Sequence, residues 1–166
     1  MAPPPTPLEP ERAAELPSAG FFRRLGALVY DSLLVIAMAL TTAGVLNVFA
    51  PRPVIPEGAE TVSLEGMQTV SGPLLGSLLF VQTFAFFAFF WIVHGRTLGM
   101  QAWRLRLVDA TGHQVTATQA LKRFIAAIPS LLLFGIGYFW QFVDRSGLSW
   151  PDRASGTRIV KLPDDG

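Results

Sequence analysis

The sequence predicts an all-α, polytopic integral membrane protein with a small cytoplasmic β element. The chain of 166 residues is 51% hydrophobic and only 15% charged, whereas soluble domains carry about 25% charged residues. The apolar residues gather in three long segments, residues 25–50, 74–93 and 124–143. Each segment reaches the roughly 20 residues that a helix needs to cross a bilayer core of about 30 Å.

The composition also excludes several classes of protein. Without cysteine, the chain can form neither disulfides, thiolate-bound metal sites nor a cysteine nucleophile. Two histidines are too few for a His-rich metal site. A net charge of +1 does not indicate the strongly basic surface that nucleic-acid binding needs. We therefore expect no metal, no cofactor and no nucleic-acid partner.

The N-terminal residues 1–18 are rich in proline and lack the basic region and apolar core of a signal peptide. This composition is typical of a disordered tail in polyproline-like conformation. The predicted membrane domain covers residues 19–161, and residues 162–166 form a short C-terminal tail.

The loops predict the orientation of the chain. Two arginines stand directly before the first segment, basic residues outnumber acidic ones in the loop after the second segment, and the loop 51–73 is acidic. The basic residues in question are Arg23, Arg24, Arg96, Arg104, Arg106, Lys122 and Arg123. By the positive-inside rule, the N-terminus and the second loop are cytoplasmic in a bacterial-type plasma (inner) membrane.

The first segment carries a buried charge. Asp31 lies inside it and Arg24 at its start, seven residues or about 10 Å apart along one helical stripe. An intramembrane carboxylate costs at least ~2.5 kcal/mol and is usually paired or functional. Asp31 is therefore either a structural residue that accepts from an arginine or a helix terminus elsewhere in the bundle, or a site for a cation or proton. The shared stripe also predicts coupling of Asp31 to Arg24, directly or through water.

The second segment ends in the phenylalanine-rich run 84–93. We expect this run to face lipid or pack in the bundle, with Trp91 in the interfacial aromatic belt. The polar Gln82 and Thr83 either face Asp31 or form interhelical hydrogen bonds.

The cytoplasmic loop that follows predicts β structure. Residues 103–107 alternate apolar and basic side chains, 109–112 have turn chemistry, and 113–115 can return as the second strand of a hairpin. Residues 157–161 can add a third strand if the C-terminus is also cytoplasmic. Thr116 or Thr118 then caps a helix that enters the membrane at Lys122 and Arg123.

The third segment leaves two interpretations open. Pro129, Gly135 and Gly137 interrupt it, and such residues weaken a helix. A broken helical hairpin would leave the basic C-terminal stretch in the cytoplasm, which slightly favours it, whereas a kinked helix would simply span.

Asp152 follows Pro151 in a turn-like stretch. We expect it to cap backbone N–H groups or to form a salt bridge that locks the loop before the last strand. A role coupled to Asp31 would require this loop to fold back toward Arg24, and an intramembrane aspartate dyad is not supported. We therefore expect no enzyme.

Three blocks, GFFRRLGALVYDSLLV at 20–35, GRTLGMQAWRLRLVDATG at 95–112 and LSWPDRASGTRIV at 148–160, together resemble the RDD family of membrane proteins. The family is named for one arginine and two aspartates, which fall on Arg24, Asp31 and Asp152. The resemblance also covers Thr97, Gly99, Gly156 and Thr157. Pro151 stands where the family often has histidine, so a proton-relay role for that histidine does not apply here.

For this family, membrane transport including cation–proton exchange has been suggested. The resemblance therefore implies transport of a monovalent cation or proton. Three segments cannot easily enclose a water-filled path, so transport predicts a homo-oligomer. The alternative is a non-transporting scaffold or assembly factor for other membrane proteins.

Overall fold

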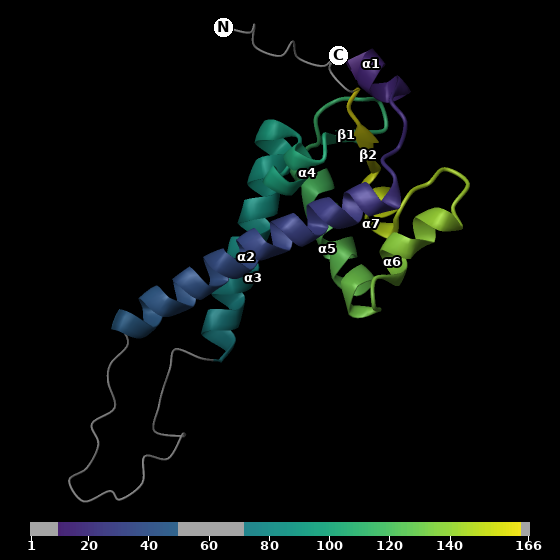
Figure 1. Ribbon diagram of the computed structural model, residues 1–166. Coiled ribbons are helices and arrows are strands. Elements are labelled where there is room, and N and C mark those ends of the chain that lie inside the picture. The colour runs from purple at the N-terminus through teal and green to yellow at the C-terminus, as the bar shows by residue number, and fades with distance from the viewer. Residues whose placement is uncertain (1–9, 50–71, 164–166) are drawn as a thin grey trace, which may run out of the picture. The chain divides into compact units, whose positions relative to one another are not determined.

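The computed structural model describes residues 10–49 and 72–163, which form mostly helices and one small sheet (Figure 1). The N-terminal part comprises α1 (Pro10–Glu15), α2 (Phe21–Phe49), α3 (Pro73–Phe89), the π-helix η2 (Phe90–His94), α4 (Leu98–Ala102) and β1 (Leu105–Asp109). The C-terminal part comprises α5 (Ala117–Leu132), α6 (Ile136–Phe139), the 3-10 helix η3 (Trp140–Phe142), α7 (Trp150–Ser155) and β2 (Thr157–Lys161). The loop expected at 51–73 lies almost wholly outside the described residues.

Two helices are long and apolar enough to cross a membrane, namely Phe21–Phe49 and Pro73–His94. They correspond to the first two apolar segments and confirm that each forms a single continuous helical stretch. Within the described ranges, the number of candidate spans rises to three only if the bent pair Ala117–Leu132 and Ile136–Phe142 is counted as one.

That pair bends by 108° at the break between α5 and α6. Phe134 and Gly135 adopt left-handed backbone angles, with φ of 53° and 81°, and such angles end a helix. Beyond the break, Gly137 packs so closely on Ser130 that a Cβ at Gly137 would lie 2.1 Å from the Ser130 hydroxyl oxygen. The third apolar segment is therefore broken at its glycines and folds back on α5.

The chain divides into two compact units. One unit consists of residues 33–83 and contains parts of α2 and α3. In it, the Thr42 hydroxyl donates to the Gln82 side-chain oxygen at 2.8 Å, and the Thr83 hydroxyl donates to the backbone oxygen of Leu79 at 2.7 Å. These bonds support the interhelical interpretation of Gln82 rather than a contact with Asp31.

The other unit combines residues up to 32 with residues from 84 onward, and it contains the sheet. β1 pairs antiparallel with β2, in a register that places Leu105 opposite Lys161 and Asp109 opposite Thr157. The strand expected at 157–161 is confirmed, and it pairs directly with β1. The expected hairpin strand at 113–115 does not form.

The turn after β1 explains why residues 113–115 do not form a strand. The Asp109 carboxylate accepts hydrogen bonds from the backbone N–H groups of Thr111 and His113, and the Asp109 N–H donates to the His113 carbonyl. This tight turn leads straight into α5. There Thr116 and Gln119 form a capping box, as expected for a helix that begins at Thr116.

The N-terminal segment differs from the disordered tail expected at 1–18. Residues 1–9 lie outside the described residues, but residues 10–15 form α1, and Ser18 bridges to Val160 of β2. Ala13 is buried against Val108 and Val160, with Leu16 beside them. The segment is ordered because it covers apolar residues of the sheet and supplies a partner to the free edge of β2.

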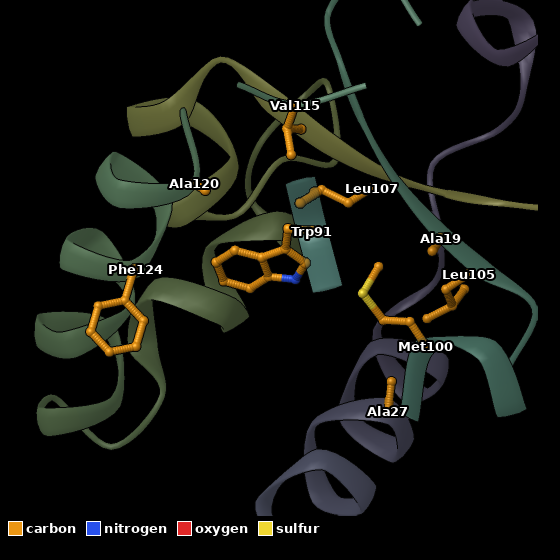
Figure 2. Close-up of a cluster of buried hydrophobic side chains, with 9 residues drawn as sticks. All are labelled: Ala19, Ala27, Trp91, Met100, Leu105, Leu107, Val115, Ala120 and Phe124. Atoms are coloured by element: carbon orange, nitrogen blue, oxygen red, sulfur yellow. The ribbon is translucent and has the colours of Figure 1, made fainter. Parts of the chain in front are cut away.

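The apolar core lies between η2, α4, β1 and α5, joined by Ala19 and Ala27 (Figure 2). Trp91 lies inside this core at 8% exposure, beside Met100, Leu107 and Phe124. For Trp91, this burial supports packing in the bundle rather than a lipid-facing side chain. Packing within the protein, rather than lipid, surrounds its indole.

Candidate functional site

Arg24 begins the first polar cluster near the start of α2. Its Nη1 donates to Oδ2 of Asp152 at 2.5 Å, its Nε donates to the Ala19 carbonyl at 2.9 Å, and its Nη2 donates to the Ser18 hydroxyl at 2.8 Å. The Arg24 side chain is only 6% exposed. The guanidinium thus ties α2 to the chain before it and to α7.

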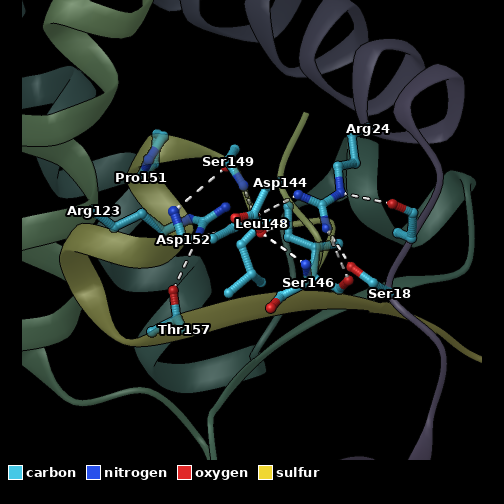
Figure 3. Close-up of polar contacts among 12 residues, drawn as sticks. Ser18, Arg24, Arg123, Asp144, Ser146, Leu148, Ser149, Pro151, Asp152 and Thr157 are labelled. Carbon is cyan, nitrogen blue, oxygen red and sulfur yellow. Dashed lines mark hydrogen bonds and ion pairs between the residues drawn. The ribbon is translucent and has the colours of Figure 1, made fainter. Parts of the chain in front are cut away.

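Arg123 of α5 approaches Asp152 from the opposite side (Figure 3). Its Nη1 donates to Oδ1 of Asp152 at 2.7 Å and to the Thr157 hydroxyl at 2.9 Å. Its guanidinium carbon also lies 5.5 Å from the centroid of the Trp91 ring, which favours the cation. One carboxylate therefore bridges two buried arginines that belong to different helices.

The local sequence of α7 fixes Asp152 in this position. Ser149 is the N-cap, Pro151 stiffens the first turn, and Asp152 accepts from the Ser149 N–H at 3.0 Å in a capping box. Gly156 ends the helix at φ of 65°, and Thr157 begins β2. The expected salt bridge with a basic residue forms, and Asp152 also accepts from a backbone N–H, but it does so as the third residue of α7 and not as its N-cap.

The electrostatics of Asp152 follow from this geometry. Burial on its own would raise the pKa of Asp152, because the side chain is fully buried. The guanidiniums of Arg123 and Arg24 and the Ser149 N–H outweigh burial and hold the pKa below its ordinary value. Asp152 is consequently ionised at neutral pH, and the cluster carries one net positive charge.

Asp31 forms a separate polar cluster two turns further along α2. Its Oδ2 accepts from the Thr97 hydroxyl at 2.5 Å, and its Oδ1 accepts from the Gly99 N–H at 2.8 Å. Thr97 is the N-cap of α4, and its hydroxyl also accepts from the Met100 N–H at 3.1 Å. Asp31 is only 3% exposed, and no basic side chain pairs with it within the described ranges.

Close packing makes this second cluster dependent on glycine. A Cβ at Gly99 would lie 2.3 Å from the Ala27 carbonyl and 2.8 Å from Oδ1 of Asp31. At the other end of α4, the Trp103 indole lies so close to Gly26 that a Cβ there would be 2.4 Å away. Thr97 and Gly99 therefore form the part of α4 and its cap that docks on α2.

The structure separates Arg24 from Asp31, although they share a helical stripe. Arg24 bonds to Asp152, and Asp31 bonds to Thr97 and Gly99. No direct bond joins Arg24 to Asp31, because each side chain meets a partner from another element. Asp31 instead accepts from the N-terminus of α4, which is the helix-terminus partner that the sequence left open. The fold-back of residue 152 toward Arg24, which the sequence left open, does occur.

Sequence reasoning missed Arg123 as a site residue and assigned it to the membrane boundary with Lys122. The structure places Lys122 on the surface and Arg123 inside. A signal existed in the sequence: Arg123 follows Ala120 by three residues, and both Ala120 and Phe124 belong to the buried stripe of α5. In the described part of the chain, no group of three or more His, Asp or Glu side chains could hold a metal ion.

Apolar helices long enough to cross a membrane, with the charged side chains Arg24 and Asp31 buried on the first of them, are typical of helical membrane proteins. The model of the RDD family matches residues 18–156, which is most of the chain and includes Arg24, Asp31, Arg123 and Asp152. The chain belongs to the RDD family.

A curated relative extends the comparison. The chain is 35% identical over 78 residues to "Uncharacterized protein RP437" of Rickettsia prowazekii (strain Madrid E). The match covers 46% of this chain and 43% of the relative, so it spans less than half the length of either protein. No solved structure matches the chain.

Proposed function

We propose that this protein is a multi-pass protein of a bacterial-type plasma membrane that transports a monovalent cation or proton. Asp31 is the ion-binding carboxylate in this proposal. The observation that carries it is the burial of Asp31 in a helix of spanning length, with hydroxyl and amide partners but no basic partner within the described ranges. Such an intramembrane carboxylate needs a proton or cation to balance its charge.

The partner of Asp31 suits this role. The Thr97 hydroxyl can donate to an ionised carboxylate or accept from a protonated one, so it can remain bonded in both states. A helix N-cap holds that hydroxyl in place. Because few segments surround Asp31, the transport path is completed in a homo-oligomer.

The strand pairing supports the proposed topology. β2 pairs with β1, which follows the second span, and bridges to Ser18, which precedes the first. These segments must lie on the same side of the membrane, and the positive-inside rule assigns that side to the cytoplasm. The N-terminus and C-terminus are then both cytoplasmic, and the broken third segment re-enters rather than spans.

A second candidate function is a non-transporting scaffold or assembly factor for other membrane proteins. The cluster around Asp152 favours this candidate, because Arg24, Arg123 and Asp152 are all buried and paired with one another, as in a structural site. Neither candidate is enzymatic: Asp31 and Asp152 have separate partners, and a catalytic dyad requires a shared proton.

The test is a flux assay in proteoliposomes with imposed Na⁺, K⁺ or pH gradients. The wild type should exceed protein-free vesicles for at least one gradient, and Asp31→Asn should fall to the protein-free level while its melting temperature in detergent stays near the wild-type value. Asp144→Asn is the matched control, since it removes a carboxylate outside the spans, and it should retain flux. Unchanged flux in Asp31→Asn, or a strictly monomeric protein in native nanodiscs, would refute transport and favour the scaffold.

A further inference from the structure

Two arginines lie beside each other just beyond the second candidate span. That span ends at His94, and Arg96 follows it by two residues. Arg106 belongs to β1, on the strand that returns toward the same point. If Pro73–His94 crosses the bilayer as proposed above, both residues lie at the depth of the lipid headgroups.

A backbone contact holds the two arginines together. The Leu107 N–H donates to the Gly95 carbonyl at 2.7 Å, so the residues next to that bond, Arg96 and Arg106, are neighbours. The Arg106 side chain covers Gly95: a Cβ at residue 95 would lie 3.3 Å from Nε of Arg106. A backbone hydrogen bond therefore keeps residues 96 and 106 close together, and their proximity does not depend on contact between two long side chains.

The positive charges of Arg96 and Arg106 repel each other. Burial lowers the pKa of Arg106, and the positive charge of Arg96 lowers it further. Within the described residues, the ion pairs involve Arg24, Arg123 and Arg153, and neither Arg96 nor Arg106 takes part in one. Two adjacent half-buried guanidiniums are stabilised when an anion binds between them.

The surroundings indicate which anion this is. The phosphate of a lipid headgroup is available at this depth and accepts paired hydrogen bonds from guanidinium groups. Beside Arg96 in the sequence, Val93 and Leu98 are 56% and 41% exposed, and both are apolar. They offer a surface to acyl chains that a soluble phosphate would not use.

We propose that Arg96 and Arg106 form a binding site for the phosphate of an anionic phospholipid at the membrane surface. The site fixes the loop 95–116 to the bilayer through one lipid. It is distinct from the cluster around Asp152 and from the Asp31 carboxylate, and its occupancy does not require transport.

The experiment measures retained lipid on the full-length protein in detergent by native mass spectrometry. The protein is titrated with phosphatidylglycerol or phosphatidylcholine, and the variants are Arg96→Gln, Arg106→Gln and Arg145→Gln as the charge-matched control. We expect the wild type to prefer phosphatidylglycerol. Each of the first two substitutions should weaken its binding about fivefold, whereas Arg145→Gln should leave it unchanged.

Arg106→Lys keeps the charge but loses the paired donors, so it should bind between the wild type and Arg106→Gln if the fold is intact. Equal retention of the two lipids, or the same loss in all three glutamine variants, would overturn the proposal. Displacement of the lipid by an equal concentration of glycerol 3-phosphate would also overturn it, because the site would then take a free phosphate. These measurements report lipid binding and not ion flux. If the transport proposal failed, the lipid-binding proposal would therefore still be tested.

Discussion

At the scale of single residues, Asp152 holds two buried arginines in place. Its fully buried carboxylate pairs with guanidiniums from both α2 and α5 and completes the capping box of α7. If either arginine is removed, the other still has its counter-ion. If Asp152 is removed, two buried cations face each other without one.

We therefore expect Asp152→Asn to destabilise the protein more than Arg24→Gln does. Breaking a buried pair by removing one partner costs about 3–5 kcal/mol, and here the loss exposes two arginines to mutual repulsion. Unfolding of the detergent-solubilised protein by heat or denaturant measures the difference. Asp144→Asn is the control, because its partner Arg153 is half-exposed and an asparagine oxygen can still accept from the Leu148 N–H, so the midpoint should fall less than in Asp152→Asn. Equal midpoints for Asp152→Asn and Arg24→Gln would contradict the bridging role.

The same substitution has a pH signature. Because the pKa of Asp152 is held below its ordinary value of 3.8, its contribution to stability is present above that pH and is lost as the pH falls through the lowered value. The stability gap between wild type and Asp152→Asn should accordingly be widest at neutral pH and shrink in acid. A gap that is constant down to the acid range would show that the loss is not electrostatic.

At the scale of elements, α4 packs closely against α2 because glycines at the contact leave room for it, and hydrogen bonds add to this packing. Gly99 lets the Asp31 carboxylate reach the N–H at the start of α4, and Gly26 accepts the Trp103 indole. These contacts fix the loop that follows the second span. They also explain why the sequence carries glycine at a helical position, where alanine is intrinsically better.

Gly99→Ala tests this docking. Its Cβ would overlap the Ala27 carbonyl, so we expect a loss of about 1–3 kcal/mol from overpacking. Gly44→Ala is the control in α2, since no atom lies within 4 Å of its Cβ, and it should be neutral or slightly stabilising. Thermal unfolding of both variants in the same detergent gives the comparison. A neutral Gly99→Ala would mean that α4 does not dock as described.

Local chemistry accounts for the elements that the sequence predicted well. The cap at Thr116 and the break near Gly135 depend on neighbouring residues alone, and both occur where expected. The hairpin strand at 113–115 failed for a different reason. Strand pairing depends on which segments meet, and β2 and the Asp109 turn together displaced the local partner.

At the scale of the whole molecule, the pairing of β1 with β2 limits how the chain can cross a membrane. We expect both termini on one side, with the third apolar segment entering and leaving on that side. A cysteine at Gly166 in intact spheroplasts should be shielded from an impermeant thiol reagent, whereas a cysteine at Gly58, in the loop between the first two segments, should react. Labelling of Gly166→Cys as strong as that of Gly58→Cys would establish a plain third span.

The sequence by itself determined the membrane class, the bounds of the apolar segments, the weak point of the third segment and the family to which the chain belongs. These follow from composition, helical length and the backbone preferences of proline and glycine, which are properties of adjacent residues. Only the tertiary structure decided the partners of the charged residues. Arg24 meets Asp152 across 128 positions and Asp31 meets Thr97 across 66, while Arg123 joins the first pair from a third helix. Helical spacing placed Arg24 and Asp31 on one stripe, but a buried charge bonds to the nearest complementary group that packing brings to it, and that group is set by how the helices fold together.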